Sequence, residues 1–554
     1  MFKKMQKALA IMLMLSFPGI GSSFVFGQGG GGQSAGVGAD APVSQANRAV
    51  EGVVPAAEKY KPVYSEVEPT LTAEQQASID RMEIHRDRAY RNLNSKLEPV
   101  SDHPVEGPKF YKMMRDGTFR SDETEVPGEI TKADGTGTLF RNSDVTITGA
   151  SASVIHEPAH AQIGKNVFYT ANWYAARSGN GGSTFTYLNP FTDFPAMCCD
   201  QDVAHDVSRN LILWYRQGSM ATNGTNQVKL SVSTNGGLSF LTYTWSPTTF
   251  DASLTNRWFD YPHLALSNNF LYLVSNVFNA SDTQTHRIIV RMPLEQLAVG
   301  AAFNYYRWTF TAGQTITPVQ GATETMYFGS AESSAGTFRV FSWPESTTTL
   351  TSIGRTVPAW TPTNKDGICT VANGRNPCGR ADQRVTAGWV AKGVIGFFWN
   401  VRQGGGFPYP YINAATFRES DKLYLARPYI YNTGFAFQYG AAAPNIRGDL
   451  GIALLAAGGS IGYPRFWVGI DDGYNGVPPG WELYHIVSST NWGKTGTGKE
   501  GAGDYLRVRQ FSPVGSIWTA SGYYGFGSTV AYKGKFVVFG RGREQRAFSR
   551  WNAL

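Results

Sequence analysis

The chain has 554 residues, of which 13% are aromatic and 62 are glycine, and its formal net charge is +7. A single ordinary core rarely grows to this length, so several domains or a ring of repeated units are expected. Helix-forming charged runs are scarce after about residue 100, which together with the glycines and aromatics favours an all-β protein. Three of the excess positive charges are Lys3, Lys4 and Lys7. The remaining excess gives no sign of the clustered basic face that nucleic-acid binding uses, so no nucleic-acid partner is expected.

Residues 1–28 are typical of a secretory signal peptide, with a basic start, an apolar stretch over 8–17 and small residues near Gly27. The apolar stretch is too short to span a bilayer, and no later stretch reaches the roughly 20 apolar residues that a spanning helix needs. We therefore expect an exported protein, extracellular or periplasmic, without a transmembrane segment.

The next part of the chain is expected to lie outside the main domain. Residues 29–70 are Gly-rich and polar, which predicts an irregular spacer. Residues 71–145 form an N-terminal extension in which one helix is expected, because Thr72 and Gln75 fit a capping box. Apolar residues then recur at helical spacing, at Ile79, Met82, Tyr90, Leu93 and Leu97. We expect this helix to pack as an arm against the β domain.

From residue 146 to 554, short β-type runs alternate with Gly, Asn, Pro and Ser, which is typical of a sandwich, a barrel or a propeller. Seven units each begin with an acidic residue followed by a turn and an apolar run. Their starts lie 43 to 67 residues apart, at Glu157, Asp200, Asp260, Glu324, Asp382, Asp449 and Asp504. A four-stranded blade needs about 40 to 60 residues, so the repeat predicts a β-propeller of about seven blades. Residues 528–551 could complete the seventh blade or begin an eighth, and residues 145–148 are a candidate for the strand that closes the ring.

Two segments share the form Ser-x-Asn-x-Gly-x-(Ser/Thr)-Phe, at residues 178–185 and 233–240, and a partial third copy lies at 489–495. In such a turn a short polar side chain bonds the loop backbone and glycine supplies positive φ. These segments resemble the Asp-box hairpins of sialidase-like (BNR-repeat) propellers, with Asn in place of Asp. The resemblance covers roughly residues 150–550. It implies a radial propeller with a ligand site at the central mouth and the boxes on the opposite face. The Arg-Ile-Pro motif of true sialidases is absent, so the resemblance concerns the fold.

In that topology the innermost strand of each blade starts at the mouth, so the seven acids are expected at the rim of a central funnel. Crowded carboxylates shift one another's pKa and can form an acid/base pair or hold a cation. His, Tyr and Arg on one rim would suit a uronate lyase, since a guanidinium fork matches a carboxylate. The candidate catalytic residues are His160, His263, Tyr261, Tyr327, Asp200 and Asp202. The candidate substrate-binding residues are Arg384, Arg447, Arg507, Glu324 and Asp260. The alternative is structural: acids that accept backbone N–H groups and histidines that pack between strands.

Four cysteines in an exported chain indicate disulfides. Cys369 and Cys378 are expected to pair locally, whereas Cys198 and Cys199 either bridge each other or pair elsewhere. No metal-ligand spacing accompanies them, and a structural cation such as calcium is the one cofactor left open. We expect a secreted, monomeric, carbohydrate-active propeller that acts on a glycan, as a glycoside hydrolase at the mouth. A polysaccharide lyase and a non-catalytic glycan- or protein-binding propeller remain the alternatives.

Overall fold

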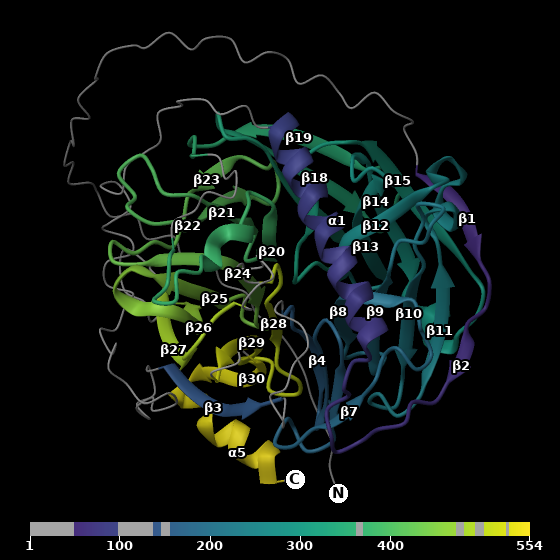
Figure 1. Cartoon of the computed structure of the whole chain (residues 1–554), viewed down its shortest axis with the longest axis horizontal. Helices are drawn as coiled ribbons and strands as arrows, with labels where there is room; N and C mark the ends of the chain where they lie inside the picture. The colour runs from purple at the N-terminus through teal and green to yellow at the C-terminus, as the bar shows by residue number, and fades with distance from the viewer. Residues whose placement is uncertain are drawn as a thin grey trace, which may run out of the picture. The chain divides into compact units, whose positions relative to one another are not determined.

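The computed structural model describes residues 49–97, 137–145, 156–361, 369–472, 481–493, 503–527 and 531–553. All of these residues belong to one compact unit, 42–554. The expected signal peptide, residues 29–48 of the expected spacer and residues 146–148 lie outside the described residues. Within the unit, seven antiparallel sheets follow one another around a centre as the blades of a propeller (Figure 1). The predicted seven-bladed, all-β fold preceded by a helix is confirmed.

Each blade begins with its innermost strand and continues outward. Blade 1 contains β4 (Ala159–Ile163), β5 (Asn166–Thr170), β6 (Ala175–Ser178) and β7 (Thr186–Leu188). Blade 2 contains β8 (Met197–Asp206), β9 (Leu211–Gly218), β10 (Val228–Ser233) and β11 (Phe240–Trp245). Blade 3 contains β12 (Arg257–Leu266), β13 (Phe270–Asn279), β14 (Gln284–Pro293) and β15 (Phe303–Thr311). Blade 4 contains β16 (Thr317–Pro318), β17 (Thr325–Ser333), β18 (Thr337–Pro344) and β19 (Thr351–Thr356).

Blade 5 contains β20 (Val385–Ala391), β21 (Val394–Val401), β22 (Tyr411–Arg418) and β23 (Tyr424–Ala426). Blade 6 contains β24 (Ala436–Pro444), β25 (Leu450–Gly458), β26 (Gly462–Asp471) and β27 (Glu482–Ser488). Blade 7 contains β28 (Arg507–Gln510), β29 (Trp518–Phe526) and β30 (Ala531–Arg541). The helices are α1 (Ala73–Leu97), α3 (Pro247–Phe250), α4 (Leu294–Val299) and α5 (Gln545–Ala553), with 3-10 turns η1 (Ala252–Leu254), η2 (Pro377–Arg380), η3 (Gly459–Ile461) and η4 (Gly542–Glu544).

Strands from before residue 146 complete three of the blades. β3 (Gly137–Asp144) pairs with β30 and is the fourth strand of blade 7, so the ring closes with an early strand against the last one. The closing strand is therefore 137–144 instead of the candidate at 145–148. β1 (Val50–Val54) and β2 (Glu58–Tyr60) add fifth strands to blades 3 and 2, within the region expected to be a spacer. The segment 531–551 supplies β30 and α5 and belongs to the seventh blade.

The predicted repeat register holds for five units and is wrong for two. Glu157, Asp382 and Asp504 lie two or three residues before an inner strand, and Asp200 and Asp260 lie in the first half of one. Glu324 instead precedes β17 and Asp449 precedes β25, which are the second strands of blades 4 and 6. Because second strands run antiparallel to inner ones, these two acids lie at the other end of the blades. The expectation that they line the mouth is wrong: acids are frequent at turns, and spacing alone placed these two.

The two full Ser-x-Asn turns connect the third and fourth strands of blades 1 and 2. In the first, Asn180 Oδ1 accepts hydrogen bonds from the backbone N–H groups of Ser183 (3.1 Å) and Thr184 (3.0 Å). Asn235 Oδ1 accepts the matching bond from Ser239 in the second turn. The glycines at 181, 182, 236 and 237 all have positive φ, which other residues rarely adopt. The partial third copy differs, because it follows β27, the fourth strand of blade 6.

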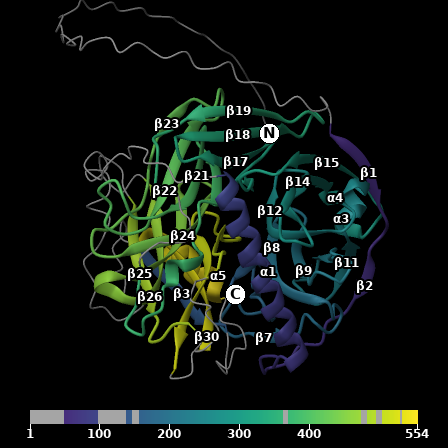
Figure 2. The ribbon, with the colours of Figure 1, turned by 45° about the horizontal axis from the view of Figure 1, so that its top comes forward.

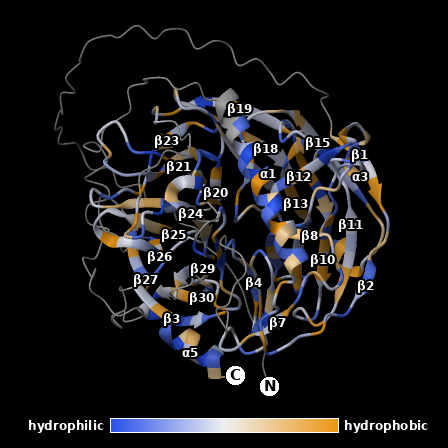
Figure 3. Cartoon of the chain, viewed as in Figure 1, coloured by the Kyte–Doolittle hydropathy of each residue, from blue (hydrophilic) through white to orange (hydrophobic). Residues whose placement is uncertain are grey.

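Helix α1 lies across the face of the ring at which the inner strands begin (Figures 1 and 2). The predicted capping box is present: Gln75 N–H donates to Thr72 Oγ1 (3.2 Å), and Thr72 N–H donates to Gln75 Oε1 (2.9 Å). Figure 3 shows hydrophobic and hydrophilic residues interspersed along this helix. Its buried face carries three of the predicted apolar residues together with an alanine and a charged pair: Ile79, Met82, Glu83, Arg86, Ala89 and Tyr90.

Both disulfides are present. Cys369 pairs with Cys378, and the neighbours Cys198 and Cys199 bridge each other. The Cys198–Cys199 bridge lies in β8 where the pairing with β9 shifts register, so the bulged strand accommodates it. In the part of the chain that the structure describes, no helix is long and apolar enough to cross a membrane.

Candidate functional site

The centre of the mouth is filled by the guanidinium group of Arg86, which α1 places there and which is 1% exposed. Its nitrogen atoms lie close to carboxylate oxygens from four blades: 2.8 Å from Asp200, 3.2 Å from Asp260, 3.4 Å from Glu157 and 3.6 Å from Asp504. Glu83, one turn earlier on α1, adds a fifth carboxylate at 2.9 Å. Four of the seven acids that the register predicted at the rim therefore meet, around a cation supplied by the same chain. We call Arg86 and these five carboxylates, Glu83 included, the acid ring.

Two further arginines connect the acid ring to blade 5. Arg380 Nη1 lies 3.0 Å from the Glu83 carboxylate of α1. Arg384 lies 2.7 Å from Asp382 and 3.0 Å from Asp504. Arg380 ends the 3-10 turn η2, which also contains Cys378, so the disulfide-bridged loop contributes to the mouth. Charges from α1 and from blades 1, 2, 3, 5 and 7 thus form one buried network.

Burial and neighbouring charges shift the pKa values of two of these carboxyl groups up and that of a third, Asp202, down. Burial raises the pKa of Asp200 well above its usual range; Arg86 opposes this shift, while Glu157 and Asp260 add to it. Burial also raises the pKa of Asp260. Asp202 behaves differently: burial tends to raise its pKa, but Arg507 outweighs this and the pKa is lowered. The pKa values of two carboxyl groups on one strand, β8, are therefore shifted apart: upward at Asp200 and downward at Asp202. Such a difference is what allows one carboxyl group to act as a general acid and the other as a base.

Aromatic side chains form a layer directly below α1. Tyr505 and Tyr261 stack with ring centroids 5.1 Å apart, and the edge of Tyr90 on α1 meets Tyr261. The Tyr505 hydroxyl donates to Asp200 Oδ2 over 2.8 Å. Tyr261 has a φ of +56° at a bulge of β12, a strained conformation for a bulky residue. Such strain is found preferentially at active sites and ligand clamps.

Deeper in the channel, Asp202 accepts a forked pair of bonds from Arg507, 2.9 Å from Nε and 3.0 Å from Nη2. His263 lies against Tyr261, with centroids 4.6 Å apart, and its Nε2 atom is buried without a hydrogen-bond partner among the described residues. Burial and Arg507 lower the pKa of His263 well below its usual value, so it is neutral near pH 7. His160 instead faces the boundary between blades 1 and 7, where Nε2 lies 2.8 Å from Thr519 Oγ1. His160 therefore packs between strands, which was the structural alternative to a catalytic role for this residue.

Three of the predicted site residues lie away from the mouth. Tyr327 is on β17 and donates to Glu419. Glu324 is exposed before that strand. Arg447 pairs with Asp449 and with Glu544 at the other end of the blades. The structure thus brings together Asp200, Asp202, Asp260, Tyr261, His263, Arg384 and Arg507, and separates them from these three and from His160.

Sequence reasoning missed Glu83, Arg86 and Arg380. A signal was present for the first two, because they lie on the same helical face as Ile79 and Tyr90, where charged residues are costly unless they are paired. Among the residues that the structure describes, no group of His, Cys, Asp or Glu is suited to holding a metal ion.

No family model and no curated protein matches this chain. Solved structures with a similar fold include a Trypanosoma rangeli sialidase in complex with the inhibitor DANA, at 9% identity and a TM-score of 0.33 over 61% of this chain and 54% of that one. They also include the α-L-arabinofuranosidase Arb93A from Fusarium graminearum, at 9% identity and a TM-score of 0.36 over 72% of this chain and 97% of that one. An α-L-arabinanase from Penicillium chrysogenum complexed with arabinobiose matches at 10% identity and a TM-score of 0.34, over 71% and 97%.

This chain spans about half the length of the sialidase chain. The described residues form a seven-bladed β-propeller, and a helix of the same chain, α1, covers its central mouth.

Proposed function

We propose that this protein is a secreted glycoside hydrolase whose active site is the acid ring, and that α1 closes this site in the present structure. The observation that carries the proposal is the pair of carboxylates on β8. Asp200, with a raised pKa, is suited to donate a proton to a leaving oxygen, and Asp202, held ionised by Arg507, is suited to act as the base or nucleophile. Arg384 and Asp260 would bind the substrate, and the strained Tyr261 would orient it.

In this proposal α1 must leave the mouth before a glycan can enter. Three large apolar side chains of α1 are buried, Ile79, Met82 and Tyr90. Their burial contributes about 2 kcal/mol each, or roughly 6 kcal/mol in total. The buried ion pairs of Arg86 add to this, because the carboxylates of Glu157, Asp200 and Asp260 lose their counter-ion when the helix leaves the mouth.

The test compares the full chain with an Arg86→Glu variant, in which a carboxylate replaces the guanidinium group among five others. Both proteins are incubated with a panel of neutral and acidic glycans, and new reducing ends are measured. We expect turnover that increases in Arg86→Glu and is lost when Asp200→Asn is added. Arg81→Glu, an exposed charge reversal on the same helix, is the matched control. Binding of a glycan without turnover by any folded variant would refute a hydrolase and support a binding propeller.

A lyase acting on uronate-containing glycans is a second candidate, favoured by His263. This histidine is neutral, its Nε2 atom has no hydrogen-bond partner among the described residues, and Tyr261 and Arg507 lie beside it. A base, an acid and a cation are the groups that β-elimination requires. In the same assay, a lyase would produce the absorbance of an unsaturated uronate, and His263→Ala would abolish it.

A further inference from the structure

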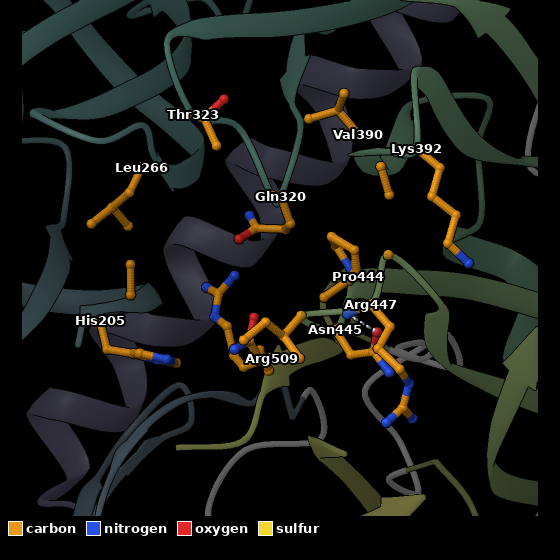
Figure 4. A pocket seen from close by; sticks show the side chains of 17 residues that line it. His205, Leu266, Gln320, Thr323, Val390, Lys392, Pro444, Asn445, Arg447 and Arg509 are labelled. Atoms are coloured by element: carbon orange, nitrogen blue, oxygen red, sulfur yellow. Dashed lines mark hydrogen bonds between the residues drawn. The ribbon is translucent and has the colours of Figure 1, made fainter. Parts of the chain in front are cut away.

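The central channel has a second opening, at the end of the blades opposite α1. A cavity of about 560 Å³ lies there, lined by the carboxyl-terminal ends of inner strands and the turns that follow them. Figure 4 shows the side chains around it, contributed by blades 2 to 7. The volume falls within the range of about 300–1,000 Å³ that is typical of small-molecule sites. We call it the lower cavity.

Arg509, near the end of β28, forms the inner wall of the lower cavity and is 4% exposed. Its Nη2 atom donates to the carbonyl oxygen of Val203 over 2.6 Å. Its Nε atom is buried without a hydrogen-bond partner among the described residues. The carboxylate nearest to it is that of Asp202, at 3.7 Å, which is already held in a fork by Arg507. Two buried guanidinium groups therefore share one carboxylate.

The other positive charges around the lower cavity already have partners. Lys392 lies 2.7 Å from Asp449, and Arg447 lies 3.1 Å from Asp449 and 2.8 Å from Glu544. Among the described residues, the charge left without compensation is a single positive one at Arg509. An uncompensated buried cation is unfavourable. In agreement, burial lowers the pKa of Arg509 to about 10.

Neutral polar and apolar groups surround this charge. His205 lines the same wall, and burial lowers its pKa to about 3, so that it stays uncharged. Its buried Nδ1 atom has no hydrogen-bond partner among the described residues. Gln320 extends toward the centre in Figure 4. Pro444 and Ile446 provide apolar surface, and Ile446 is 74% exposed at the edge.

We propose that the lower cavity binds a singly charged, carboxylate-bearing ligand of sugar size, such as a uronic acid, with its carboxylate on Arg509. A guanidinium group matches the planar carboxylate. One uncompensated positive charge is balanced by a monoanion, whereas a dianion such as phosphate would leave a negative charge buried. His205 and Gln320 would bind hydroxyl groups, and Pro444 and Ile446 would pack against the apolar face of the ring. This site does not depend on hydrolase activity, because the acid ring lies at the other end of the channel.

The test is calorimetric titration of the full chain with glucuronate, with neutral glucose and with inorganic phosphate at pH 8. We expect glucuronate to bind, glucose to bind at least tenfold more weakly, and phosphate to bind more weakly than glucuronate. Arg509→Gln should weaken glucuronate binding at least tenfold. Because Arg509 is buried, its replacement can also disturb folding, so a substitution at an exposed residue provides a second test. Ile446→Glu should also weaken glucuronate binding at least tenfold through charge repulsion, while Ile446→Gln leaves the affinity within threefold.

Glucose that binds as tightly as glucuronate would overturn the role of the carboxylate. Phosphate that binds more tightly would overturn the charge argument. An unchanged glucuronate affinity in Ile446→Glu, or no binding by the folded wild type, would overturn the location. Each of these results is independent of whether glycan turnover is observed at the mouth.

Discussion

Replacement of Arg86 by alanine tests whether the acid ring holds α1 on the mouth. The guanidinium group lies within 3.6 Å of carboxylates from four blades, and its removal leaves Glu157, Asp200 and Asp260 buried without this counter-ion, whereas Asp504 keeps Arg384. Removing one partner of a buried ion pair costs about 3–5 kcal/mol. Burial already raises the pKa of Asp200, so this carboxyl group can become protonated when Arg86 is absent. Protonation then keeps the loss of stability near the lower end of this range.

The expected effect is local to α1, because the blades have their own core. A loss of about 3–5 kcal/mol corresponds to an increase of roughly a hundredfold to a few thousandfold in the opening constant of the helix. Amide hydrogen exchange of residues 73–90 measures this constant directly. Exchange of the inner strand β12 should change little, which distinguishes undocking of α1 from global unfolding.

The matched control is Arg81→Ala, an exposed arginine on the same helix, which should change stability by less than about 0.5 kcal/mol. The double variant Arg86→Met, Asp200→Asn should recover part of the loss, since replacing both partners by neutral groups removes the unpaired charge. If exchange of 73–90 in Arg86→Ala equals that of Arg81→Ala, apolar contacts hold the helix and the reasoning from the ion network is wrong.

Three further predictions concern the mouth, a turn and a bridged loop. Burial raises the pKa of Asp200 in the folded protein, so folding takes up a proton at this carboxyl group: its contribution to the free energy of unfolding should be fully present below about pH 4 and be lost as the pH rises through the raised value, and Asp200→Asn should flatten this dependence in urea unfolding measured between pH 5 and 8. Asn180→Ala should lower the free energy of unfolding by about 1–2 kcal/mol in urea, because two backbone N–H groups lose their acceptor, while Asn180→Asp retains it; equal loss in both would contradict the role of Oδ1. The paired change Cys369→Ser, Cys378→Ser should cost about 2–3 kcal/mol, the loop-closure entropy of a short bridge, and an unchanged denaturation midpoint would contradict it.

Local patterns in the sequence were sufficient for the individual elements. The capping box at Thr72 and Gln75 and the apolar residues Ile79, Met82 and Tyr90 predicted α1, because a helix is governed by contacts within four residues. The Ser-x-Asn turns were predictable because the Asn side chain accepts hydrogen bonds from backbone N–H groups only three or four residues later. The blade count follows from seven units whose starts lie 43 to 67 residues apart, about the length of a four-stranded blade. These features depend on short separations, which a sequence displays directly.

Local patterns could not predict where the acids of blades 4 and 6 lie within their blades. An acid before an apolar run occurs at either end of a blade, and only the pairing of strands shows that Glu324 and Asp449 precede second strands. The closing strand at 137–144 is likewise separated from its partner β30 by almost 400 residues. Nothing in the local sequence of either strand specifies the other.

Sequence patterns were enough to predict an all-β ring of seven blades, the helix before it, and the acids near the start of five inner strands. That the helix lies on the mouth, with Arg86 among four of those acids, is visible only in the folded chain. The physical reason is that one side chain, Arg86, pairs with acids of blades 1, 2, 3 and 7. These acids come close to one another only when the ring of blades has closed. The uncompensated charge of Arg509 has the same origin, because it depends on which carboxylate another blade brings near it.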